Sequence, residues 1–197
     1  MPGPADAPLD APGLGDADLP PALAAAIRRS THPRLLGTAF LAQCSPRIRR
    51  FWDYWNARRG GRAMPSRRDI DPTEIPDLLP YIVLTDVLAE PPFLRYRLVG
   101  TKQVAVRGRD PTGQPVRGNY IGHHLGDTED EVLLNYRIVI EGRIAVYDAN
   151  PILGPQDAGS SLLQRPVRER GTLLLPLSSD GENVDVVFCC ADIETPA

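Results

Sequence analysis

The sequence predicts one α+β domain, in which an antiparallel sheet carries its helices on one face. Three observations support this fold class. The predicted elements follow the order helices, two strands, helical segments, one long helix and three strands. Hairpin-type connections join neighbouring strands, which gives an antiparallel sheet. With 197 residues, of which 42% are hydrophobic and 24% charged, the chain is large enough to bury its own core.

The two longest predicted helices have clear start and stop signals. The first spans residues 45–60: Ser45 is a suitable N-cap, Pro46 occupies the first helical position and Gly60 is a suitable stop. Its apolar stripe has i, i+3, i+4, i+7 spacing and consists of Ile48, Phe51, Trp52 and Trp55. The second spans residues 128–142 and begins with a capping box of Thr128 and Glu131. Its apolar face consists of Val132, Leu133, Tyr136, Val139 and Ile140.

Five predicted strands complete the domain, at residues 81–88, 93–99, 143–148, 172–177 and 184–193. In the second of them, Leu94, Tyr96 and Leu98 alternate with Arg95 and Arg97, so the three apolar residues share one face. Thr101 follows this strand and can cap a short helix. We expect the core to include Phe51, Trp55, Leu84, Tyr96, Leu98, Val104, Leu133, Tyr136, Leu174 and Val186.

The chain divides into four parts. Residues 1–21 hold six prolines and four aspartates without any Lys or Arg, which predicts a disordered tail. Residues 22–45 form an N-terminal helical extension with a short helix, residues 46–193 the α+β domain, and residues 194–197 a C-terminal tail.

Composition excludes several classes of protein. A formal net charge of −3 argues against a general nucleic-acid binder, which is usually strongly basic. No apolar run approaches the ~18 residues that a membrane span needs, and the N-terminus does not read as a secretory signal. Cys44, Cys189 and Cys190 make a poor disulfide framework, because adjacent strand residues point to opposite faces. We therefore expect a soluble protein of the cytoplasm.

Four phrases of the sequence carry a family resemblance. They are FWDYWNARRGGRAMPSRRDIDPTEIPDLLPYIVLTDV, FLRYRLVGT, RGRDPTG and LLLPLSSDGENVD, and the match runs from about Phe51 to about Ile193. In these phrases the chain resembles the PAS family, specifically its small stand-alone bacterial proteins. The resemblance implies a five-stranded antiparallel sheet with helices that cover a central cavity. It also implies a sensory or signalling protein that dimerises, binds a small ligand or a protein partner and regulates that partner, with no output domain of its own.

Two groups of residues become candidate sites on this interpretation. From the predicted facing of the elements, we expect an apolar ligand pocket lined by Val87, Leu98, Val104, Tyr120, Leu125, Tyr136 and Phe188. Because aromatic residues and Arg are enriched at interface cores, we also expect a homodimer interface formed by Phe51, Trp52 and Trp55. The alternative for these three rings is that they pack onto their own sheet.

The sequence leaves the cofactor unknown. Haem-binding PAS domains use a histidine on a helix, whereas His123 and His124 precede the predicted helix at residues 128–142. Light-sensing flavin PAS domains use a reactive cysteine in an Asn-Cys-Arg context, which this sequence lacks.

Two other classes of function remain as alternatives. An enzyme would have to use the cluster of His123, His124, Asp127 and Glu129, whose spacing matches no standard zinc pattern and whose simpler interpretation is surface loop residues. A nucleic-acid binder would use the eight arginines between Arg47 and Arg68, which a solvated basic face also explains. The turn Arg107-Gly108-Arg109-Asp110 is interpreted as structural, with phosphate binding as its alternative.

Overall fold

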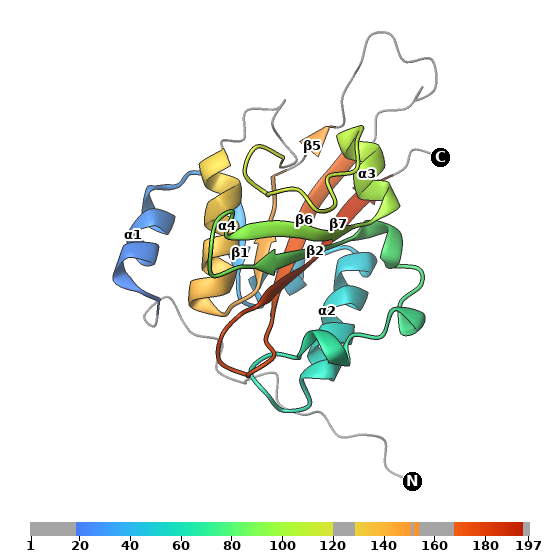
Figure 1. Ribbon diagram of the computed structural model, residues 1–197, viewed down its shortest axis with the longest axis horizontal. Coiled ribbons are helices and arrows are strands. Elements are labelled where there is room, and N and C mark those ends of the chain that lie inside the picture. Colours follow the sequence, from blue (N-terminus) through green and yellow to red (C-terminus); the bar gives the residue numbers. More distant parts are fainter. Residues whose placement is uncertain (1–18, 120–128, 151, 154–167, 195–197) are drawn as a thin grey trace.

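The computed structural model describes residues 19–119, 129–150, 152–153 and 168–194. Its strands form an antiparallel sheet in the order β1-β4-β6-β7-β2-β3, and β5 pairs with β6 beside this path (Figure 1). The strands are β1 (Arg34–Leu36), β2 (Ile82–Val87), β3 (Leu94–Val99), β4 (Val146–Asp148), β5 (Ile152–Leu153), β6 (Arg168–Leu177) and β7 (Val186–Glu194). The predicted antiparallel sheet is confirmed, but the expectation of five strands is wrong. The additional β1 and β5 are only three and two residues long, too short to show alternation.

The helices are α1 (Pro21–Arg29), α2 (Pro46–Arg59), α3 (Thr101–Arg107) and α4 (Glu129–Gly142), with four short 3-10 turns between residues 39 and 81. The start and stop signals of α2 are confirmed: the Ser45 side chain accepts a hydrogen bond from the Ile48 amide, and Gly60 ends the helix with a left-handed backbone. For α3, Gly100 rather than Thr101 is the N-cap.

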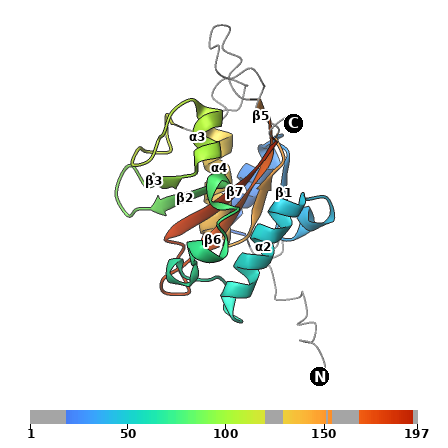
Figure 2. The ribbon, with the colours of Figure 1, turned by 90° about the vertical axis from the view of Figure 1, so that its right-hand side faces the viewer.

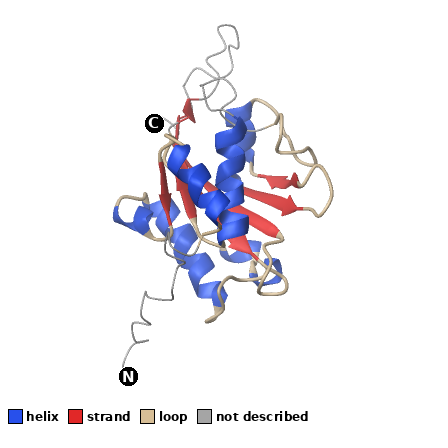
Figure 3. Ribbon diagram, turned by 90° about the vertical axis from the view of Figure 1, so that its left-hand side faces the viewer, coloured by secondary structure: helices blue, strands red, loops and turns tan. Residues whose placement is uncertain are grey.

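Helices cover both faces of the sheet, which corrects the expectation of helices on one face. Phe51 of α2 packs against Phe188 of β7, with ring centroids 4.5 Å apart. Tyr136 of α4 reaches the opposite face, where its hydroxyl lies 3.1 Å from the Thr85 hydroxyl. Figure 2 shows α2 on one side of the sheet and α3 and α4 on the other, and Figure 3 shows helices on both sides of the strands. The sequence signal for two covered faces is β7 itself, which is apolar almost throughout and buried at every residue from Val186 to Ile193.

A bulge between β2 and β3 changes which residues of β3 face the core. Leu98 pairs with Leu84, but Tyr96 pairs with Thr85, so Arg97 is an extra residue in β3. Tyr96 therefore lies on the α3 and α4 face, whereas Leu98 turns to the α2 face near the sheet edge and is 41% exposed. The prediction that Leu98 belongs to the core is wrong, because strict alternation does not hold across the bulge.

The aromatic stripe of α2 belongs to the core of its own chain. Phe51, Trp52 and Trp55 are 0%, 8% and 4% exposed. Trp52 packs against Phe40 and Trp55, and the Trp55 indole N–H donates to the carbonyl oxygen of Pro176 at 2.9 Å. This placement corrects the assignment of the three rings to a dimer interface, since they have almost no surface left for a partner. Most other predicted core residues are buried, while Val104 and Leu133 are partly buried.

Candidate functional site

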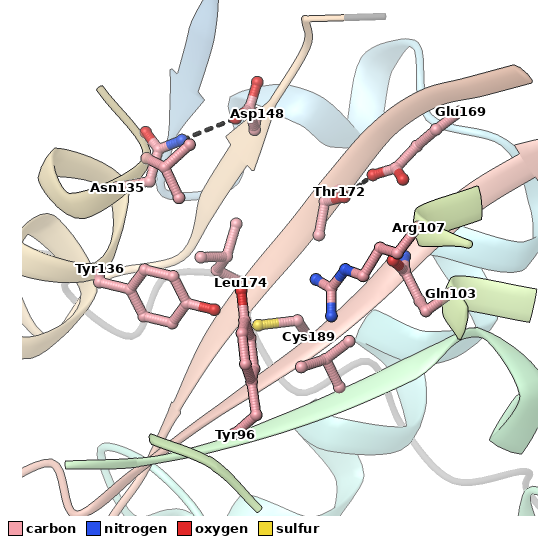
Figure 4. Close-up of a pocket in the computed structure, with 12 residues that line it drawn as sticks. Tyr96, Gln103, Arg107, Asn135, Tyr136, Asp148, Glu169, Thr172, Leu174 and Cys189 are labelled. Carbon is pink, nitrogen blue, oxygen red and sulfur yellow. Dashed lines mark hydrogen bonds between the residues drawn. The ribbon is translucent and has the colours of Figure 1, made fainter. Parts of the chain in front are cut away.

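A cavity lies between the sheet and the two helices α3 and α4 (Figure 4). Its volume is about 70 Å³, counted as the space open to the centres of water molecules. One water needs roughly 10–15 Å³ on this measure, so the cavity has room for several waters or one small ligand. It differs from the predicted apolar pocket because eight of the twelve residues that line it have side chains with polar groups.

The helix α3 contributes Gln103 and Arg107, which share one face of the helix because they are four residues apart. The start of this helix is fixed by a close approach at Gly100, where a Cβ atom would lie 2.5 Å from the carbonyl oxygens of Leu79 and Pro80. The Arg107 guanidinium lies over the Tyr96 ring, 4.7 Å from its centroid. This contact holds the guanidinium beside the cavity.

The helix α4 contributes Val132, Asn135 and Tyr136. Asn135 is 2% exposed, and its amide nitrogen donates to Oδ2 of Asp148 in β4 at 2.7 Å. A carboxylate only accepts hydrogen bonds, so the orientation of the Asn135 amide is determined and its carbonyl oxygen is left for other partners. Burial raises the pKa of Tyr136 well above its usual value, which keeps its hydroxyl neutral.

The sheet contributes Asp148 of β4, Glu169 and Thr172 of β6, and Cys189 of β7. The Thr172 hydroxyl donates to Oε1 of Glu169, which is 2% exposed. Burial raises the pKa of Glu169 to about 7, although Thr172 and Arg107 act in the opposite direction. Burial also raises the pKa of the Cys189 thiol to about 12, so this cysteine stays protonated and is a poor nucleophile.

Unpartnered polar atoms gather at this cavity. Among the described residues, ten buried side-chain nitrogen or oxygen atoms have no hydrogen-bond partner within the protein, and half of them belong to residues of the cavity wall. These five atoms are Nε and Nη1 of Arg107, Oε1 of Gln103, Oδ1 of Asn135 and Oε2 of Glu169. Buried polar groups are nearly always hydrogen-bonded, so a concentration of unpartnered ones indicates a site for another molecule.

The N-terminal extension contacts one residue of the cavity wall, Asp148. Nε2 of His32 lies 2.9 Å from Oδ1 of Asp148, the same carboxylate that holds Asn135. A second contact joins the extension to α4: Glu131 accepts hydrogen bonds from Ser30 and Arg34, at 2.6 and 2.5 Å. Residues 30–34 are therefore tied to the same helix and strand that position the cavity.

Of the seven predicted pocket residues, Tyr136 lies in this wall. Phe188 is corrected to the opposite face, where it packs against Phe51, and Leu98 is corrected to the exposed sheet edge. Val87 and Val104 are partly buried but do not line the cavity. Tyr120 and Leu125 lie outside the described residues.

Sequence reasoning missed the polar wall, since no motif marks it. Asn135 gave one usable signal, as a polar residue within the apolar face of α4. Glu169 was missed because β6 begins at Arg168, four residues before the predicted strand.

One of the four residues of the enzyme hypothesis, Glu129, lies in the described part of the chain. His123, His124 and Asp127 lie outside the described residues. Glu129 pairs with Arg117 at 2.5 Å and accepts from the Gly118 amide. The described residues contain no group of three or more His, Cys, Asp or Glu side chains placed to hold a metal ion.

The arginines of the nucleic-acid hypothesis are mostly paired. Five of the eight between Arg47 and Arg68 form ion pairs with acidic side chains: Arg47, Arg49, Arg50, Arg58 and Arg62. Arg49 pairs with Asp53 in the same helix, whereas Arg50 and Arg47 pair with the distant Asp77 and Asp192. This pairing lowers the positive charge available to phosphate groups. In the segment Arg107–Asp110, Arg107 is the last residue of α3 and Gly108 ends the helix with a left-handed backbone.

No helix in the described ranges is long and apolar enough to cross a membrane.

Comparisons with known proteins give one strong result. The family model described as PAS domain matches residues 43–190. A comparison with curated proteins finds no match. One solved structure that is similar to this chain is that of an RNA-binding Light-Oxygen-Voltage receptor. It is 15% identical, with a TM-score of 0.39, and the similarity covers 64% of this chain and 35% of that chain. The chain thus spans about a third of that protein's length, and a similarity of this degree supports no functional inference.

Proposed function

We propose that this chain, which belongs to the PAS domain family, is a sensory protein. Its cavity between the sheet and the helices α3 and α4 binds a small polar molecule. Ligand occupancy then changes the activity of a protein partner. The chain acts in this proposal as a binding and signalling module, without an enzymatic reaction of its own.

The observation that supports ligand binding is the set of five unpartnered polar atoms at the cavity. Leaving a buried donor or acceptor without a partner costs roughly 1–3 kcal/mol. A protein with no use for the cavity would gain stability from apolar residues at these positions. A wall that keeps Gln103, Asn135 and Glu169 at 2% exposure each is instead suited to recognise a ligand by its hydrogen bonds.

The signal would leave the cavity through residues 21–34. Asn135 faces the cavity with one end of its amide and holds Asp148 with the other, and Asp148 in turn holds His32. A ligand that donates a hydrogen bond to the Asn135 carbonyl oxygen would shift this chain of contacts. The shift would loosen or tighten the packing of α1. The protein then favours whichever arrangement of α1, loosened or tightened, binds the ligand more strongly.

Location and assembly are further parts of the proposal. A reducing cytoplasm suits the three free cysteines, of which Cys189 and Cys190 are buried. A homodimer stays a prediction, and it would have to use a surface other than the stripe of Phe51, Trp52 and Trp55. Light scattering on the full chain decides it: a monomer at all concentrations would remove the dimer from the proposal.

Native mass spectrometry of the purified protein tests the proposed function. We expect a bound small molecule, which denaturation releases for identification. In a Val132→Trp variant the larger side chain fills the cavity from α4, so the bound mass should disappear. The matched control is Ile140→Phe, a substitution in the same helix outside the cavity wall, which should keep the ligand. Wild-type protein that never carries a ligand, or a Val132→Trp variant that carries the same one, would refute the proposal.

A further inference from the structure

This inference rests on the proposed ligand-binding function. The polar atoms of the cavity wall then indicate the chemical class of the ligand. Arg107 is the basic residue of the wall and forms no ion pair with any described carboxylate. Two of its nitrogens, Nε and Nη1, are buried and have no acceptor. Arginine stays protonated at every physiological pH, so this end of the cavity calls for an acceptor group and favours an anion.

With Glu169 ionised, as its pKa of about 7 allows above neutral pH, the other unpartnered atoms are acceptors. Asp148 is already occupied, because it accepts from His32, Asn135 and the Asn150 amide. What remains is Oε1 of Gln103, Oδ1 of Asn135 and Oε2 of Glu169. The bond to Asp148 fixes the Asn135 amide, so its free atom is the carbonyl oxygen and not the nitrogen. These atoms call for N–H or O–H donors on the ligand.

The Arg107 nitrogens, which need an acceptor, and the three oxygen atoms, which need donors, belong to the wall of the same small cavity. All four residues line the same cavity: Figure 4 shows Arg107 and Gln103 of α3 and Glu169 of β6 on one side of it and Asn135 of α4 on the other. We infer that the ligand is a small carboxylic acid that carries amino or hydroxyl groups, with its carboxylate at Arg107 and its donors at Gln103, Asn135 and Glu169. A wholly apolar ligand would leave all five atoms unpaired and would gain little from this wall.

The pH dependence of binding distinguishes an amino group from a hydroxyl group. Glu169 faces Arg107 of α3 and Asp148 of β4, and its neighbours Gln103 and Thr172 are polar but uncharged. An ammonium group favours the ionised carboxylate, so an amino acid should bind more tightly as the pH rises from 6 to 8. A hydroxy acid has no positive charge, so we expect no such increase for it.

The test compares matched compounds in calorimetric titrations of the intact protein. One set is alanine, alanine methyl ester and propionate; the second is lactate, methyl lactate and propionate. Larger amino and hydroxy acids, each with its ester and its parent acid, extend the series. We expect binding by complete members of the series and none by their esters, which lack the anion, or by the parent acids, which lack the donors.

Two arginine-to-methionine variants separate the specific role of Arg107 from the effect of removing any positive charge. Arg107→Met should weaken binding of the complete compound about tenfold or more, the usual effect of losing a charged hydrogen-bond partner. Arg109→Met removes an exposed arginine two residues away and should leave affinity unchanged. Thermal melting of both variants checks that they are folded.

The possible failures point to different conclusions. An ester that binds as tightly as its acid, or an Arg107→Met variant with full affinity, would overturn the ligand class. Binding by no member of the series, while mass spectrometry still finds a molecule that Val132→Trp loses, would also overturn the class but leave the proposed function intact. Binding that is equal in the wild type and Val132→Trp would instead refute the cavity as the site.

Discussion

Asn135 donates its side-chain amide to Asp148 at 2.7 Å, while the carbonyl oxygen of the same amide has no partner among the described residues. One residue thus joins the cavity to the strand β4 behind it. Asp148 extends the connection to His32 of the N-terminal extension, at 2.9 Å. A ligand at the Asn135 oxygen is therefore two hydrogen bonds away from the segment that follows α1.

The Asn135–Asp148 bond should contribute measurably to stability. An Asn135→Ala variant removes the donor and leaves a half-buried carboxylate with one partner fewer, so we expect a loss of about 1–3 kcal/mol in the free energy of unfolding. Urea denaturation measures this loss. Asn56→Ala in α2 is the control, since the Asn56 side chain forms no hydrogen bond with the described residues, and it should cost less than about 0.5 kcal/mol. Equal losses in the two variants would contradict the structural role of the bond.

The contact between His32 and Asp148 should hold the N-terminal extension in place. In a His32→Leu variant this contact is lost, so amides of residues 21–29 should exchange with solvent faster than in the wild type. Hydrogen exchange with mass spectrometry measures the effect, and α2 serves as the internal reference because it packs on the other face of the sheet. Unchanged exchange in α1, or a uniform increase across the chain, would speak against a specific connection.

Glu169 should give stability a characteristic pH dependence. Its pKa is about 7 in the folded chain against 4.5 ordinarily, so the folded state binds its proton more tightly than the unfolded state. The contribution of the neutral carboxyl is then complete below pH 4.5 and is lost as the pH rises through 7. The difference between the two pKa values corresponds to a loss of about 3 kcal/mol in the free energy of unfolding.

A Glu169→Gln variant isolates this effect, because glutamine does not titrate in this range. Urea denaturation at pH 5 and pH 8 should show that the wild type loses more stability than the variant between the two values. Parallel pH profiles for both proteins would show that Glu169 does not titrate differently on folding.

Gly171 should be essential to the packing of β4 against β6 behind the cavity. A Cβ atom there would lie 2.5 Å from the carbonyl oxygen of Asp148 and 2.6 Å from the Tyr147 hydroxyl. Gly171→Ala should therefore cost roughly 1–3 kcal/mol and displace Asp148. Gly113→Ala is an informative comparison, because its Cβ would meet no atom within 4 Å and only its positive φ opposes the change. Thermal unfolding of both variants tests the close approach; a Gly171→Ala variant as stable as the wild type would show that the strands can separate freely.

The sequence predicted much of the fold because local signals and burial agree in most elements. Ser45, Pro46 and Gly60 mark the ends of α2, and the structure places the helix between them. The predicted antiparallel sheet and the PAS resemblance are confirmed in the same way.

The errors arise where tertiary structure overrides a local pattern. Arg97 is an extra residue opposite Leu84, and this bulge turns Leu98 away from the face of Tyr96. Phe188 and Cys189 lie on opposite faces of β7, but both are buried, so alternation does not show which one faces the cavity. The polar wall was not predictable either, because Gln103, Arg107, Asn135 and Glu169 come from three separate elements with no shared motif.

Methyl NMR of the intact protein tests the central claim, that the cavity of the α3 and α4 face is where a small polar molecule binds. The spectra are recorded on protein that has been refolded after release of its bound ligand, with valine and leucine methyl groups labelled, before and after addition of the small-molecule filtrate of a cell extract. The cavity wall supplies Val83, Val132 and Leu174 as reporters, while Leu173 and Leu175 lie on the α2 face of the same sheet. We predict that the three cavity methyl signals shift and that those of Leu173 and Leu175 stay in place. Unchanged signals at the cavity, or equal shifts on both faces, would contradict the account.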